Sequence, residues 1–122
     1  NYTGRKLIDD LDAKDVLGVL WDPANNCWCH ENAYPEGYDE IKDGYLSHIH
    51  IKDVQVDTPR ATLEVRPMGE GQLAPLFKPL ADALRADNYD GVISFESVYH
   101  PGNGDFEAGF RQNIGLFKEL FG

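Results

Sequence analysis

The sequence has few cysteines and no long apolar run, and each shortage excludes a class of protein. The two cysteines, Cys27 and Cys29, flank Trp28 and lie too close for an ordinary disulfide, so the chain is not a disulfide-rich scaffold. No apolar run approaches the roughly 18 residues that a membrane-spanning helix needs. No charged segment followed by an apolar leader opens the sequence. We therefore expect no membrane partner and a cytoplasmic location.

Basic residues are also scarce, and they are dispersed along the chain. Lys and Arg number 11 against 21 Asp and Glu, which gives a net charge of −10, and the densest basic spot is only Arg5-Lys6. Because a protein that binds duplex nucleic acid needs clustered Lys and Arg to neutralise phosphates, we expect no nucleic-acid partner. An acidic surface favours a bound divalent cation, although such a surface more often serves solubility.

The chain is short as well, at 122 residues. Its composition, with 42 % hydrophobic and 26 % charged residues, is typical of a globular domain. A (β/α)8 barrel typically has about 250 residues, so this length excludes a complete one. The sequence shows no internal repeat and no interdomain linker, and we expect a single domain over residues 1–122.

Short apolar segments alternate with helical patterns along the chain. The patterns predict helices over residues 4–13 with Thr3 as N-cap, over 35–43, over 73–87, and from Asp105 as N-cap to the end. They predict strands over 16–22, 46–53 and 91–97, a loop over 23–34, and a hairpin arm that includes 62–65. Because strands separated by helices pair in parallel through right-handed crossovers, the fold class is α/β.

Ionisable residues gather at the ends of the three predicted strands. Asp22 ends the first strand, His48, His50 and Lys52 share one face of the second, and Glu96 lies at the end of the third. Functional groups collect beyond the carboxyl ends of parallel strands, and carboxylate and imidazole ligands suit Mn²⁺, Mg²⁺, Co²⁺ or Zn²⁺. A strand histidine is often a hydrogen-bonded core residue, and an acid at a strand end often caps the next helix. The same pattern on three strands nevertheless favours a metal site.

Four segments carry a resemblance to a known family: GVLWDPANN, HIHIKDV, PMGEGQL and DNYDGVISFES. In this order, and over nearly all of the chain, they resemble the sugar-phosphate isomerase/epimerase proteins, which have the xylose-isomerase-like TIM-barrel fold. The resemblance implies that residues 1–122 are a partial domain, the C-terminal half of a (β/α)8 barrel. That half has parallel strands six, seven and eight with flanking helices, and it lacks strand five and everything before it.

The resemblance also implies a site and a reaction. The family binds one divalent metal ion with two glutamates, an aspartate and a histidine, and by motif Asp22, His50 and Glu96 correspond to three of these ligands. The remaining glutamate belongs to strand five. The implied reaction is proton transfer on a small sugar or sugar phosphate through a metal-stabilised enediolate, with Glu96 as one acid/base.

Four further residues are expected to support this site. Asn25, where several epimerases have a histidine, is a candidate for substrate binding, as are Lys52 on the inward face and Arg66 before the glycine turn. A pairing of Lys52 with Asp53 at the rim is an equal alternative for that lysine, and a solvated position is an alternative for Arg66. His48 lies one layer below the ligand histidine, so we expect it to support that ligand or to pack.

Other functions remain open for the chain. The isolated chain is expected to be incomplete and inactive, and its exposed half-barrel edges invite self-association. A sugar-acid or inosose-type dehydratase would use the same metal and the same enolate chemistry. A nuclease of the endonuclease IV type is disfavoured. Such proteins carry D-x-x-H and Asp-x-His motifs where this chain has Asp22-Pro-Ala-Asn25 and Glu64-Val-Arg66, which removes ligands for a trinuclear zinc site.

Overall fold

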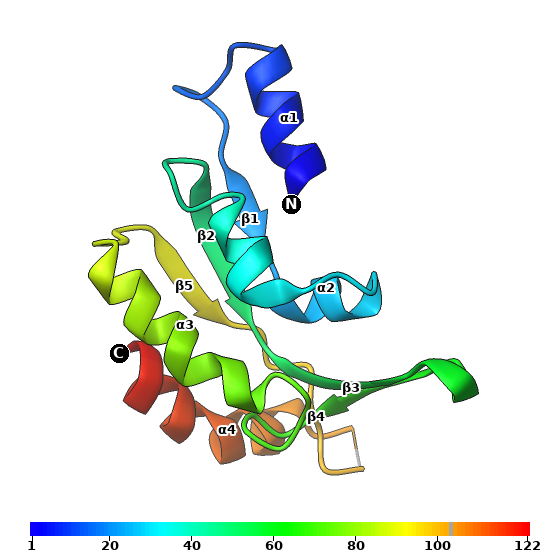
Figure 1. Ribbon diagram of the computed structural model, residues 1–122. Coiled ribbons are helices and arrows are strands. Elements are labelled where there is room, and N and C mark those ends of the chain that lie inside the picture. The colour runs from blue at the N-terminus through cyan, green and yellow to red at the C-terminus, as the bar shows by residue number, and fades with distance from the viewer. Residues whose placement is uncertain (103) are drawn as a thin grey trace.

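A three-stranded parallel sheet with helices packed on one face forms the centre of the molecule (Figure 1). This computed structural model describes residues 1–102 and 104–122. The helices are α1 (Tyr2–Asp10), α2 (Pro23–Trp28), α3 (Ala74–Ala86) and α4 (Phe106–Phe121), with a π-helical turn η1 (Ala33–Gly37) and a 3-10 turn η2 (Thr58–Arg60). The strands are β1 (Val19–Trp21), β2 (Leu46–Ile51), β3 (Asp53–Asp57), β4 (Thr62–Arg66) and β5 (Val92–Phe95).

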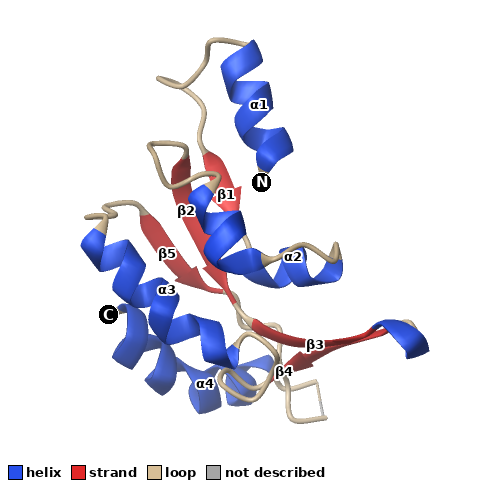
Figure 2. Cartoon of the chain, viewed as in Figure 1, coloured by secondary structure: helices blue, strands red, loops and turns tan. Residues whose placement is uncertain are grey.

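The parallel sheet has the order β1-β2-β5, so β2 is its central strand. In the register between β2 and β5, His50 lies opposite Ser94 and Ile51 lies opposite Phe95. Strands β3 and β4 form a separate antiparallel hairpin, which extends away from the sheet as an arm (Figure 2). The α/β class, the parallel pairing and the hairpin arm are therefore confirmed.

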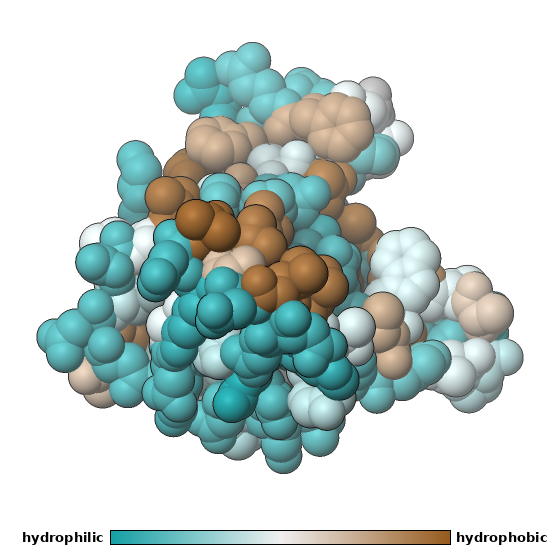
Figure 3. Space-filling model, turned by 90° about the horizontal axis from the view of Figure 1, so that it is seen from above, coloured by the Kyte–Doolittle hydropathy of each residue, from teal (hydrophilic) through white to brown (hydrophobic). Residues whose placement is uncertain are grey.

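The two faces of the sheet have different partners. On one face Trp21, Ile49 and Ile51 are at most 2 % exposed and pack in the core beneath the helices. Residues of the opposite parity leave the other face open, where Leu20 is 53 % and Val92 is 56 % exposed. Figure 3, which looks from above onto the end of the sheet where the strands begin, shows apolar side chains in the middle of that surface. The sheet is thus not a closed barrel, and its inward face has no cover among the described residues.

The segment after β1 differs from its prediction as a loop, because residues 23–28 form helix α2. The side chain of Asp22 caps this helix by accepting hydrogen bonds from the backbone N–H groups of Ala24 and Asn25. Pro23 stands at the first helical position, where its fixed φ and missing N–H favour helix initiation. Asp22 is therefore held in a defined position by the helix that it starts.

Two helices begin at other residues than the sequence predicts. Helix α1 begins at Tyr2, so Thr3 lies inside the helix and is not its N-cap. Asn1 takes the capping position, and its side-chain amide donates a hydrogen bond to the carbonyl of Gly37 instead of capping the helix. The helix predicted over 35–43 begins as the turn η1, with Pro35 inside it. The helices α3 and α4 agree with the prediction, and Asp105 caps α4 through the N–H of Ala108.

A buried carboxylate joins the sheet to the hairpin arm. Asp53 is 1 % exposed, and its two oxygens accept hydrogen bonds from four backbone N–H groups, those of Val54, Gly69, Gly71 and Leu73, at 2.9–3.1 Å. Gly71 approaches so closely that a Cβ built there would lie 2.3 Å from the Asp53 Oδ1 atom. This network holds the glycine turn (residues 67–72) against Asp53, two residues beyond the end of β2.

Within the described part of the chain, none of the helices is both long enough and apolar enough to cross a membrane.

Candidate metal centre

Asp22, His50 and Glu96 converge at the carboxyl ends of the three parallel strands. Asp22 follows β1, His50 lies near the end of β2, and Glu96 follows β5. One ligand atom of each residue lies within 4.8 Å of the ligand atoms of the other two. Two carboxylates and an imidazole around one point are a donor set that fits Mg²⁺, Mn²⁺, Co²⁺ or Zn²⁺. This group of side chains could therefore hold a metal ion.

Asp22 divides its two carboxylate oxygens between the helix and the site. Oδ1 accepts from the backbone N–H groups of Ala24 at 2.9 Å and Asn25 at 3.2 Å. Oδ2 is left for the site, and the residue is 8 % exposed. One oxygen of Asp22 therefore caps the helix, and the other remains available as a candidate metal ligand.

Glu96 is placed by the sheet. Its backbone N–H donates to the carbonyl of Ile51 at 2.9 Å, which continues the pairing of β5 with β2 by one residue. Its Oε2 atom lies 3.7 Å from Nδ1 of His50. Burial alone would raise the pKa of Glu96, but the hydrogen bond and charge of Lys52 outweigh it and hold that pKa below its usual value. Glu96 is therefore an ionised carboxylate at neutral pH.

Lys52 lies between the two carboxylates. Its Nζ atom donates to Oδ2 of Asp22 at 2.5 Å and to Oε2 of Glu96 at 2.6 Å, and its side chain is 14 % exposed. Burial favours a lower pKa for Lys52, yet the hydrogen bonds to the two acids raise its pKa overall. The alternative pairing of Lys52 with Asp53 is wrong, because the carboxylate of Asp53 is taken up by the backbone of the glycine turn.

His48 supports the layer beneath the three converging residues. Its Nε2 atom is 2.8 Å from the hydroxyl of Ser94 on the neighbouring strand. Its ring meets that of His50 edge to face, with centroids 5.0 Å apart. The position below His50 agrees with the expected supporting role. Ser94, which shares the face of Glu96, is the partner that ties His48 to β5.

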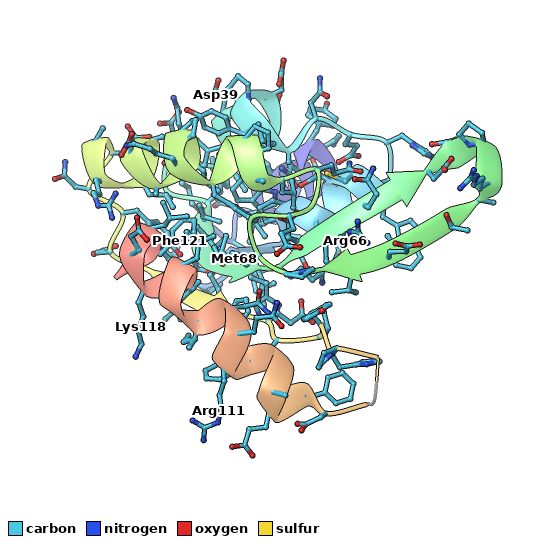
Figure 4. The ribbon with its side chains drawn as sticks, turned by 90° about the horizontal axis from the view of Figure 1, so that it is seen from below. Asp39, Arg66, Met68, Arg111, Lys118 and Phe121 are labelled. Carbon is cyan, nitrogen blue, oxygen red and sulfur yellow. The ribbon has the colours of Figure 1, made fainter. Side chains whose placement is uncertain are left out.

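The two remaining sequence candidates are Asn25 and Arg66. Asn25 is exposed on α2 and lines a shallow hollow of about 210 Å³ that Asp22 also lines. Arg66 lies on the hairpin arm (Figure 4), where its guanidinium contacts Glu64 at 3.2 Å. The structure thus places Asn25 beside the candidate centre and gives Arg66 a partner on its own strand.

A larger hollow of about 450 Å³ lies between α2 and the hairpin arm, and its lining includes Trp28, His30 and Leu63. None of the three converging side chains lines it. This hollow is therefore separate from the candidate metal centre.

Comparison with known proteins identifies the fold family. The family model for the xylose isomerase-like TIM barrel matches residues 2–120. This family includes sugar isomerases and epimerases as well as endonuclease IV. Searches of the curated proteins and of the solved structures gave no match.

Proposed function

Because the chain belongs to the xylose isomerase-like TIM barrel family, we propose that it is the metal-binding, C-terminal half of a sugar or sugar-phosphate isomerase or epimerase. The observation that carries this proposal is the convergence of Asp22, His50 and Glu96 within 4.8 Å at the carboxyl ends of three parallel strands. Barrel enzymes place their active sites at this end of the sheet. In the family, this half would contribute strands six to eight.

Asp22, His50 and Glu96 would hold one divalent ion, with Mn²⁺, Mg²⁺, Co²⁺ and Zn²⁺ as candidates. The fit is supported by the ammonium of Lys52, which already brings a positive charge within 2.6 Å of both carboxylates. When bound, a metal ion supplies charge stabilisation for two neighbouring oxygens of the substrate. The fourth ligand and a second acid/base would come from the strand-five glutamate that the family resemblance implies.

Glu96 would move the proton. In the metal-free protein the pKa of Glu96 lies below the usual value, so the carboxylate is ionised and able to accept the proton from the carbon next to a carbonyl group and return it. Asn25 and Lys52 would contact substrate oxygens near this carboxylate, and Arg66 would contact a substrate hydroxyl or phosphate. His48, held by Ser94, would keep His50 in place from below.

The test is exchange of carbon-bound protons, followed by NMR in deuterated water with Mg²⁺ and a panel of ketoses and ketose phosphates. The protein with its barrel complete should introduce deuterium beside the carbonyl, and Glu96→Gln should reduce the rate at least a hundredfold. Loss of water instead of exchange would assign the dehydratase. Full exchange by Glu96→Gln would refute the role of Glu96.

The open inward face of the sheet also bears on the activity of the isolated chain. Leu20 and Val92 are more than half exposed on the face that a closed barrel fills with side chains. We infer that the chain alone is inactive, and that it turns over sugars only when a second copy or further strands cover this face. Turnover by a purified monomer would contradict this inference.

A nuclease of the endonuclease IV type remains the less supported family function. Position 25 is asparagine, and Glu64 and Arg66 pair with each other on the arm. The described residues therefore offer one group of metal ligands. We expect no cleavage of duplex DNA with an abasic site in the presence of Zn²⁺. Cleavage would favour the nuclease over the sugar isomerase or epimerase.

A further inference from the structure

The ammonium of Lys52 binds one oxygen atom of each carboxylate in the candidate metal centre. Oδ1 of Asp22 is already taken by two backbone N–H groups of α2, so Oδ2 is its free oxygen, and that atom accepts from Lys52 at 2.5 Å. Oε2 of Glu96 accepts from Lys52 at 2.6 Å and is also the oxygen nearest Nδ1 of His50, at 3.7 Å. A metal ion bound by these two oxygen atoms would therefore compete directly with the ammonium of the lysine.

The topology explains why a lysine reaches this position. The three residues that follow β1, β2 and β5 directly are Asp22, Lys52 and Glu96. Because β2 is the central strand, its residue lies between the two acids of the edge strands. The side chains of Lys52 and Asp22 are only 14 % and 6 % exposed. The side chain of Glu96 is 34 % exposed. A buried and a half-buried carboxylate this close to each other repel unless a cation lies between them.

We propose that Lys52 is an exchangeable internal cation: it neutralises Asp22 and Glu96 in the metal-free protein, and a divalent ion displaces it when it binds. This inference rests on the metal site of the proposed function. It adds that the protein is built to keep the acids in place without metal and that it binds metal more weakly as a result. The flexible stem of a lysine allows such a movement, whereas a planar arginine fork favours a permanent pair.

Displacement would give the lysine a second use. Lys52 lies on the same face of the sheet as His50 and is tethered to the end of the central strand. Once released from the carboxylates, its ammonium is free to pair with an anionic oxygen of the substrate beside the metal. Metal binding would thus prepare the charge that binds the substrate.

Titration with Mn²⁺ in a calorimeter tests the competition. Lys52→Met removes the charge and keeps most of the stem, so the metal affinity should rise at least tenfold. Lys78→Met is the matched control, because Lys78 is exposed on α3 and pairs with Asp82, and its metal affinity should equal that of the wild type. Unchanged or weaker Mn²⁺ binding by Lys52→Met would overturn the proposal.

A measurement on the unmutated protein avoids any effect of the substitution on folding. In ¹⁵N NMR, the Nζ of Lys52 should give a slowly exchanging ammonium signal without metal, and saturating Zn²⁺ should abolish it. Persistence of that signal with bound Zn²⁺ would overturn the displacement. If wild type and Lys52→Met bind metal equally, only this inference fails; if neither binds metal, the proposed metal site fails with it.

Discussion

At the scale of single residues, Asp22 combines a structural and a chemical task. One oxygen caps α2, and the other accepts from Lys52 in the candidate centre. The helix cap orients the carboxylate, which removes conformational freedom that a ligand on a loop would have to lose on binding metal. The order of β1, Asp22 and α2 along the chain is therefore what points this ligand into the site.

Substitutions of Asp22 separate its two tasks. Asparagine caps helices about as well as aspartate, so Asp22→Asn should keep α2 while losing the charge. Asp22→Ala loses the cap as well and should be less stable than Asp22→Asn by about 1 kcal/mol. Urea unfolding of the two variants measures this difference. Equal stability would show that the cap hydrogen bonds contribute nothing to folding.

The pH dependence of stability reports on Glu96. Its pKa is lower in the folded protein than its ordinary value of 4.5, because the hydrogen bond to Lys52 outweighs the effect of burial. Its contribution to the free energy of unfolding is therefore present above about pH 4.5 and is lost as the pH falls through the lowered pKa. Urea unfolding of wild type and Glu96→Gln should show a difference at pH 7 that disappears at low pH. A difference independent of pH would contradict the ionised state of Glu96.

At the scale of secondary-structure elements, alternation was the most informative signal in the sequence. The pattern from His48 to Lys52 predicted β2 and assigned its histidines to the face opposite Ile49 and Ile51, and burial confirms this. Helix α2 was missed because six residues are too few for a helical period to be visible. Its signal was present in the pair Asp22-Pro23, which starts the helix.

The glycine turn below β2 depends on close approach of the backbone to Asp53. If no atom moved, Gly71→Ala would place a methyl group 2.3 Å from Oδ1 of Asp53. The variant should lose about 1–3 kcal/mol, because the buried carboxylate or the turn must shift. Gly115→Ala in α4 is the control: nothing lies within 4 Å of its added carbon, and alanine favours the helix by up to about 1 kcal/mol.

Chemical denaturation compares the two alanine variants directly. The structure requires that Gly71→Ala unfolds at lower urea concentration than the wild type, and that Gly115→Ala does not. A Gly71→Ala variant as stable as the wild type would mean that the hydrogen bonds of Asp53 can rearrange without loss of folding stability.

At the scale of the whole molecule, the position of Lys52 could not be predicted from the sequence. Its contacts join the ends of three strands, and they depend on the order β1-β2-β5 and on the register of each pair. A sequence pattern places Lys52 on the face of His50 but does not say which side chain it meets. The convergence of Asp22, His50 and Glu96 was predictable, because parallel strands end at the same edge.

The open inward face predicts association of the isolated chain. Leu20, 53 % exposed on β1, lies on this face, whereas Leu7, 56 % exposed, lies on α1. Light scattering after size exclusion should show oligomers that Leu20→Lys shifts toward monomer. Leu7→Lys is the control with equal loss of apolar surface and should leave the distribution unchanged. A strictly monomeric wild type would contradict the expected self-association.

Mn²⁺ titration of the wild type and of two histidine variants tests whether Asp22, His50 and Glu96 form a metal centre. His50→Asn removes a ligand from the candidate centre, while His30→Asn removes an exposed histidine at a positive φ that asparagine tolerates. We expect one bound ion per chain, with affinity reduced at least tenfold by His50→Asn and unchanged by His30→Asn. Equal binding by all three proteins, or no binding by the wild type, would contradict a metal centre formed by Asp22, His50 and Glu96.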